Sequence, residues 1–214
     1  MELFKFIRLG IIFIGVGLSN CSTPGEYKIQ GTATGIGQGM VCIISYLNKK
    51  ADTLAKAEIK EEKFELKGKV SNLTIATLQI PGKGIGHAPI YLENTDYTVR
   101  LNPQNLEMSE IIGGGESQKI AHGLFLIDQN LSQAIDSIRD EYIKEANNPQ
   151  STRFQELNTF LDSIQQTIEK QKEAFLQKNA TTYVALNHIA QNADRMNLKE
   201  LTERYSLLNY KIAF

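Results

Sequence analysis

The sequence lacks both an apolar run long enough to cross a membrane and a concentration of basic residues suited to nucleic acid. A membrane-spanning helix needs about 20 predominantly apolar residues, whereas the N-terminal apolar stretch Leu9–Leu18 has only ten. Lysine and arginine number 23 against 24 for aspartate and glutamate, which gives a formal net charge of −1. Proteins that neutralise nucleic-acid phosphates carry a basic stripe, and this sequence has none. We therefore expect neither a spanning helix nor a nucleic-acid partner.

Residue patterns typical of catalytic and metal sites are also missing. The two cysteines, Cys21 and Cys42, form no C-x-x-C pair, so a two-cysteine redox centre is not expected. The histidines His87, His122 and His188 show no H-E-x-x-H spacing, and no serine stands in G-x-S-x-G. Cys42 lies in an apolar stretch, where cysteine is usually an inert small hydrophobe. We expect no catalytic residue, no metal site and no cofactor; a metal site assembled from distant positions is the alternative.

Two glycine-rich stretches, Gly35–Gly39 and Gly82–Gly86, raise the question of a phosphate-binding loop. Such a loop leads directly into a helix N-terminus, whose dipole faces the anion. Each stretch here precedes an expected strand instead, so both are predicted to be turns or bulges.

The N-terminus has the layout of a bacterial export signal. Lys5 and Arg8 precede Leu9–Leu18, which would form a helix of about 15 Å, short of a hydrocarbon core of roughly 30 Å. A positive segment, a short apolar core and then small or polar residues make up a secretory signal peptide. The following residues, Leu18-Ser19-Asn20-Cys21, resemble the lipobox of bacterial lipoproteins, although Asn20 departs from the Gly, Ala or Ser usual before the cysteine.

The lipobox resemblance implies a signal peptide over residues 1–20, lipidation of Cys21, and a linker over residues 21–26. Stable anchoring usually needs more than one acyl chain, and a diacylated cysteine meets that condition. Ser22 resembles the residue that directs many Gram-negative lipoproteins to the outer membrane. The alternative is an ordinary signal peptide followed by an incidental Cys21.

Residues 27–115 read as an antiparallel β-domain. Polar and apolar residues alternate in Tyr27–Gly31, Lys63–Gly68 and Tyr97–Leu101. This period of two residues is typical of a strand with one buried and one solvent-exposed face. Met40–Tyr46 and Leu73–Ile80 are more continuously apolar, as strands covered on both faces would be. About eight short strands separated by turn signals predict a sandwich or barrel.

Residues 116–214 change to a helical period, with a hinge predicted at Gly113–Gly115. Apolar residues recur every three or four positions from Ile120 to Tyr142, and again from Phe154 to Phe175. The two stripes predict an antiparallel helix hairpin. Two shorter helices should follow, the last beginning at Asn197, which is expected to cap the amide of Glu200. Its predicted buried face consists of Leu198, Leu201, Tyr205 and Leu208. The fold class is thus α+β.

Several short motifs occur in a fixed order: Tyr27–Gly31, Asp52-Thr53 before Ala57, Lys63–Val70, Ile90–Asn94 with Tyr97–Val99, Ile112–Gly114, and the helical stretches Asn179–Leu186 and Leu201–Leu208. Their order and spacing resemble a known β-domain, the DUF4369-like N-terminal domain of Bacteroidota lipoproteins. In that family the β-domain usually precedes a helical segment and then a thioredoxin-like domain of the TlpA/ResA, AhpC/TSA class. The resemblance covers about residues 27–208 and implies thiol–disulfide exchange, a chemistry that needs an activated thiolate and a resolving partner. No residue of this sequence matches that redox centre.

Two functional readings follow. The first is a non-catalytic cell-envelope lipoprotein, anchored through Cys21 to the outer membrane facing the periplasm, that binds a protein or peptide partner. The alternative is a partial thioredoxin-like interchange protein whose redox domain is missing from this sequence. An in-frame continuation with C-x-x-C would favour the alternative.

Overall fold

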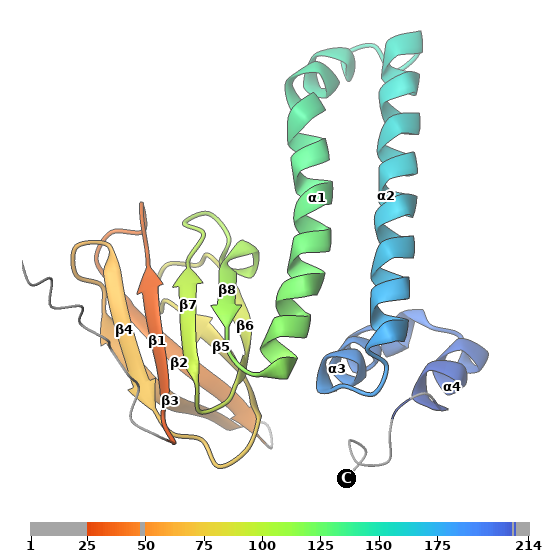
Figure 1. The fold of residues 1–214 in the computed structure, drawn as a ribbon. Coiled ribbons are helices and arrows are strands. Elements are labelled where there is room, and N and C mark those ends of the chain that lie inside the picture. Colours follow the sequence, from red (N-terminus) through yellow and green to blue (C-terminus); the bar gives the residue numbers. More distant parts are fainter. Residues whose placement is uncertain (1–24, 48–49, 207, 209–214) are drawn as a thin grey trace, which may run out of the picture.

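The computed structural model describes residues 25–47, 50–206 and 208. These residues form eight strands followed by four α-helices (Figure 1). One short 3₁₀ helix lies between the last two strands, and another lies between the last two α-helices. The predicted α+β class is therefore confirmed. The strands are β1 (Tyr27–Thr32), β2 (Met40–Leu47), β3 (Lys50–Glu58), β4 (Lys63–Gly68), β5 (Thr74–Gln79), β6 (His87–Leu92), β7 (Asp96–Arg100) and β8 (Glu110–Gly113). The helices are η1 (Leu106–Met108), α1 (Glu116–Glu145), α2 (Thr152–Lys178), α3 (Tyr183–Asn192), η2 (Ala193–Arg195) and α4 (Leu198–Ser206).

The strands form two four-stranded sheets, with the orders β4-β1-β7-β8 and β3-β2-β5-β6. All neighbours within the sheets are antiparallel except β1 and β7, which run parallel, with Ile29 opposite Tyr97. The predicted antiparallel sandwich is confirmed, and this parallel pair is an exception that the sequence analysis does not predict. Between β1 and β7 the chain forms β4 on the other side of β1 and all four strands of the second sheet, so a long crossover connection separates the two parallel strands.

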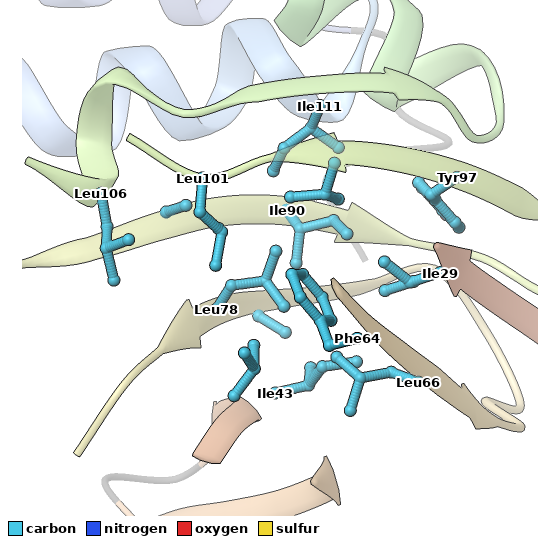
Figure 2. Close-up of a cluster of buried hydrophobic side chains, with 14 of the residues drawn as sticks. Ile29, Ile43, Phe64, Leu66, Leu78, Ile90, Tyr97, Leu101, Leu106 and Ile111 are labelled. Carbon is cyan, nitrogen blue, oxygen red and sulfur yellow. The ribbon is translucent and has the colours of Figure 1, made fainter. Parts of the chain in front are cut away.

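The side chains between the two sheets make up one continuous core (Figure 2). Ile29 and Leu66 come from the first sheet, and Ile43, Leu78 and Ile90 come from the second. All five are at most 1% exposed. Two sheets that close over interdigitating apolar residues in this way form a β-sandwich.

The burial pattern follows the alternation read from the sequence. In β4 and β7 every second residue is buried, beginning with Phe64 and Tyr97. The expectation that β5 is covered on both faces is wrong, because Ile75 is exposed. Ile75 points to the outer face of the second sheet, whereas its neighbours Ala76 and Leu78 point to the core.

At the predicted hinge, Gly113, Gly114 and Gly115 form a closely packed corner that leads from β8 into α1. Gly113 and Gly114 have positive φ angles, of 89° and 73°. A Cβ atom on Gly113 would lie 2.6 Å from the carbonyl oxygen of Asp96, and one on Gly115 would overlap the carboxylate of Glu93. These positions need glycine because the chain turns against β7 with no room for a side chain.

Helices α1 and α2 form the predicted antiparallel hairpin, which projects from the sandwich (Figure 1). Ser151 begins α2 by accepting a hydrogen bond from the amide of Phe154 over 3.0 Å. Near the loop, the hydroxyl of Tyr142 donates to Asn158 over 3.0 Å. Nearer the sandwich, Gly123 leaves space for the ring of Phe175, which a Cβ atom would approach to 2.6 Å.

Burial in the helical region is much less complete than in the sandwich. Of the apolar stripe on α1, only Ile120 is fully buried, and Ile135 is exposed. Asn197 caps Glu200 as predicted, with 2.9 Å between its side-chain oxygen and the amide. The predicted buried face of α4 is wrong for Leu198 and Tyr205, which are 80% and 58% exposed.

Among the described residues, none of the helices combines the length and the apolar character needed to cross a bilayer.

Candidate functional site: the junction between sandwich and helices

One glutamine near the start of α1 joins the helical region to both sheets. The side-chain oxygen of Gln118 accepts a hydrogen bond from the amide of Tyr91 in β6, over 3.0 Å. Its nitrogen donates to the carbonyl oxygen of Ile111 in β8, over 3.4 Å. Strands β6 and β8 are edge strands of different sheets. At 3% exposure, Gln118 therefore satisfies one buried backbone group on each edge.

Other groups close the remainder of the β6 edge. Pro89 has no amide to donate to a further strand. The hydroxyl of Tyr97 donates to the carbonyl oxygen of Tyr91 over 3.0 Å and accepts from the amide of Glu93 over 2.7 Å. The edge is thereby protected from pairing with another chain.

A second apolar cluster lies outside the sandwich, where β6, α1 and α3 meet. It contains the buried side chains of Tyr91, Ile120 and Val184. The hydroxyl of Tyr91 accepts a hydrogen bond from the side-chain nitrogen of Asn187 over 3.0 Å. Burial raises the pKa of Tyr91, so this hydroxyl remains protonated well above neutral pH. The α3 helix is thus fixed to the sandwich by both apolar and polar contacts.

Beside this cluster lies a cavity of about 270 Å³, which we call the junction cleft. It is lined by residues of α1 and α3, together with residues of β6, η1 and β8. The residues that carry polar or aromatic groups into it are Tyr91, Glu107, Ser109, Gln118, His122, Phe125, Asp128, Asn187, His188 and Gln191.

His122 has unused hydrogen-bonding capacity in the wall of the junction cleft. Its ring stacks on Phe125, with 6.0 Å between ring centroids and 17° between planes. Its Nε2 atom is buried and makes no hydrogen bond to the described residues. The nearest carboxylate oxygen, Oε1 of Glu110, is 3.5 Å away, beyond ordinary hydrogen-bond distance. The other oxygen of Glu110 is engaged by Arg100.

The cleft is also lined by an ion-paired carboxylate of α1 and a histidine of α3. Asp128 of α1 forms an ion pair with Lys172 of α2, with 3.0 Å between Oδ1 and Nζ. Burial lowers the pKa of His188, and the positive charges of Lys172 and Arg204 lower it further. His188 is consequently neutral at pH 7. It also lines a second cavity, of about 220 Å³, between the end of α2, α3 and α4.

Of the described residues that the sequence singled out as site candidates, only His122 and His188 line the junction cleft. Cys21, the predicted lipidation site, lies outside the described residues. Cys42 is buried on β2, in agreement with its interpretation as an inert hydrophobe. Gly35 and Gly37, and likewise Gly82, Gly84 and Gly86, have positive φ angles in loops before strands, as the turn interpretation predicts.

Sequence reasoning missed that His122 and His188 line the same cleft. A weak signal existed for one wall, because Gln118, His122 and Phe125 recur at helical spacing on one face of α1. Nothing in the spacing linked that face to α3, which lies more than sixty residues later in the chain. Within the described residues no group of three or more histidine, cysteine, aspartate or glutamate side chains is placed to hold a metal ion.

The eight strands form an antiparallel-rich β-sandwich domain, and a helical region follows it in the chain. Residues 27–120 match the family model described as domain of unknown function DUF4369, and this segment is a DUF4369 domain. The match ends at Ile120, so it includes Gln118 and the first turn of α1. A comparison with curated protein sequences gives no match.

Proposed function

We propose that this chain is a non-catalytic, lipid-anchored binding module of the bacterial cell envelope. The observation that carries the binding role is the junction cleft, where polar side chains from both regions surround a cavity of about 270 Å³. Binding sites are typically concave, largely preformed and furnished with a few polar groups that fix orientation. The cleft has these properties.

The proposed localisation in the cell envelope rests on the sequence of the N-terminus. Lys5 and Arg8, the apolar stretch Leu9–Leu18 and the lipobox-like Leu18–Cys21 support export, cleavage before Cys21 and acylation of its sulfur. Ser22 supports transfer to the outer membrane. Because the sandwich begins at Tyr27, only a short linker after Cys21, the module would lie close to the membrane surface.

The non-catalytic assignment is supported by the chemistry of the cleft. It contains no cysteine, and its residues are not arranged as a nucleophile with an adjacent base. Ser109 accepts a hydrogen bond from the amide of Asn102, and neither histidine is a hydrogen-bond partner of its hydroxyl. Cys42 is buried on β2, an interior strand of the second sheet, and does not line the cleft.

The test is an intact mass of the protein extracted from native membranes. We expect the mass of Cys21–Phe214 plus two or three acyl chains. A mass larger by a whole domain would support a thiol–disulfide oxidoreductase, and a chain that begins elsewhere would overturn the anchor. As a matched pair, Cys21→Ser should move the protein out of the membrane fraction and Cys42→Ser should not.

A further inference from the structure

The charges around the junction cleft are unbalanced. Two carboxylates line it, those of Glu107 and Asp128, and among the described residues no lysine or arginine does. Asp128 is partly neutralised by Lys172 through its Oδ1 atom. Glu107 takes part in none of the ion pairs within the described part of the chain, and it is exposed to solvent. An anionic ligand would therefore meet net repulsion in the cleft.

The junction cleft presents hydrogen-bond acceptors that the described residues leave available. Because the amide nitrogen of Asn187 donates to Tyr91, its side-chain oxygen remains as an acceptor. The carboxylate of Glu107 and the second oxygen of Asp128 add further acceptors. Gln118, which could otherwise donate, is occupied by the two strand edges. A ligand that donates hydrogen bonds and carries a positive charge is complementary to these acceptors.

An aromatic ring adds a second feature that favours a cation. Phe125 lines the cleft from α1, one turn before Asp128. The face of an aromatic ring attracts ammonium and guanidinium groups through its quadrupole. The neutral state of His188 means that this histidine adds no opposing positive charge at pH 7.

We propose that the junction cleft binds a basic side chain, a guanidinium or a primary ammonium, presented by a partner polypeptide. This inference rests on the proposed binding function and gives the chemistry of the partner. Glu107 supplies the ionic contact at the rim, Asp128 and Asn187 accept hydrogen bonds, and Phe125 packs against the cation. A guanidinium, with five donors in a planar fork, matches several separate acceptors best.

The test measures peptide affinity by calorimetry, with the full chain extracted from membranes in a non-ionic detergent. The probe is a blocked glycine–arginine–glycine tripeptide, and the control replaces arginine with citrulline, which has nearly the same shape but no charge. We expect the arginine peptide to bind about tenfold more tightly or better. Equal affinities, or no binding of the arginine peptide, would overturn the inference.

Two variants locate the site. Glu107→Gln removes one exposed charge without changing its shape, and we expect it to weaken binding of the arginine peptide about threefold. Glu61→Gln, an exposed residue in the turn before β4, should leave the affinity unchanged. Equal effects of the two variants would overturn the placement in the cleft, because they would reflect only the overall charge of the protein.

A final comparison identifies the source of the cation. If a blocked single arginine binds as tightly as the tripeptide, the chemistry is supported but the partner polypeptide is overturned in favour of a small free cation. These results are independent of the anchor: the mass of the native protein can establish the lipoprotein even where every peptide fails to bind.

Discussion

The sandwich and the helical hairpin use apolar residues at similar density but bury them to different extents. In the sandwich, both sheets face the same core, and side chains such as Ile43, Leu78 and Ile90 are completely buried. In the hairpin, each helix has only the other as a partner along most of its length, so its stripe stays half-buried. An amphipathic pattern predicts which face is apolar, and the number of neighbouring layers decides how far that face is buried.

The largest effect is expected from truncation in the sandwich core. Leu78 is 0% exposed, with neighbours from both sheets, so Leu78→Ala would leave a cavity that the close packing cannot fill. We expect a loss of about 3–4 kcal/mol in the free energy of unfolding, measured by urea denaturation. The matched control is Ile75→Ala on the outer face of the same strand, which should cost much less. Similar losses for both would mean that the core is not organised as described.

Alkaline pH should destabilise the sandwich through Tyr97. Burial raises the pKa of this tyrosine to about 12, from an ordinary value of 10. In the unfolded chain the hydroxyl loses its proton near pH 10, whereas in the folded chain it keeps the proton, so stability falls as pH rises from about 10 to about 12. The loss should reach about 2–3 kcal/mol at the upper end of this window. Burial also raises the pKa values of Tyr27 and Tyr91, which act in the same direction.

The check is a series of urea denaturation curves between pH 8 and pH 12 for the unmodified chain, Tyr97→Phe and Tyr205→Phe. Tyr97→Phe should be less stable at pH 8, because it loses the hydrogen bond to Tyr91, but its stability should fall less steeply with pH. Tyr205→Phe on α4 should follow the unmodified chain. A slope unaffected by Tyr97→Phe would contradict the assignment.

Within the hairpin, two leucines of α2 test the effect of partial burial. Leu157 is 2% exposed, and Leu161, one turn later, is only half-buried. We expect Leu157→Ala to cost about 2 kcal/mol and Leu161→Ala about half of that, since less apolar surface is lost. Amide hydrogen exchange should report faster opening of α1 and α2 with little change in the sandwich. Equal acceleration of exchange in the sandwich would show that the two regions unfold as one unit.

The smallest effect is expected at the joint between the regions. Gln118→Leu would leave the amide of Tyr91 and the carbonyl of Ile111 without their partner, at a cost of about 1–2 kcal/mol. Gln118→Glu keeps the acceptor for Tyr91 but loses the donor to Ile111, so it should open the β8 edge more than the β6 edge. Exchange rates of the amides in these two strands distinguish the cases. Unchanged rates in both variants would remove Gln118 as the link.

The sequence predicted the individual strands and helices better than it predicted which of them pair or pack against one another. The alternation in β4 and β7, the two stripes of the hairpin and the cap at Asn197 all depend on neighbours close in the chain, and all three are found. The parallel pairing of β1 with β7 was missed, because it joins segments about seventy residues apart and leaves no local signal. The exposure of Leu198 was missed for a related reason: the period of α4 showed an apolar face, but not whether another element covers it.

For the junction cleft, the sequence does not predict that residues from separate elements come together in one site. Gln118 looked like an ordinary polar residue in the first turn of a helix, and its two hydrogen bonds come from strands that end far apart in the chain. In the sequence, a site built from histidines can be recognised only by the spacing of these residues along the chain. That criterion detects sites built on one element, whereas this cleft takes its walls from α1 and α3.

The position of β1 inside its sheet has a consequence for the kinetics of folding. Its two neighbours are β4, about forty residues later, and β7, about seventy residues later. The strand that is synthesised first therefore cannot be flanked on both sides until residue 100 is present. Closing such long loops has an entropic cost that is recovered only when the contacts form, which slows the search for the native topology. We expect refolding in milliseconds to seconds, as for other proteins dominated by non-local strand pairs, with the docking of β7 beside β1 as the step that commits the chain.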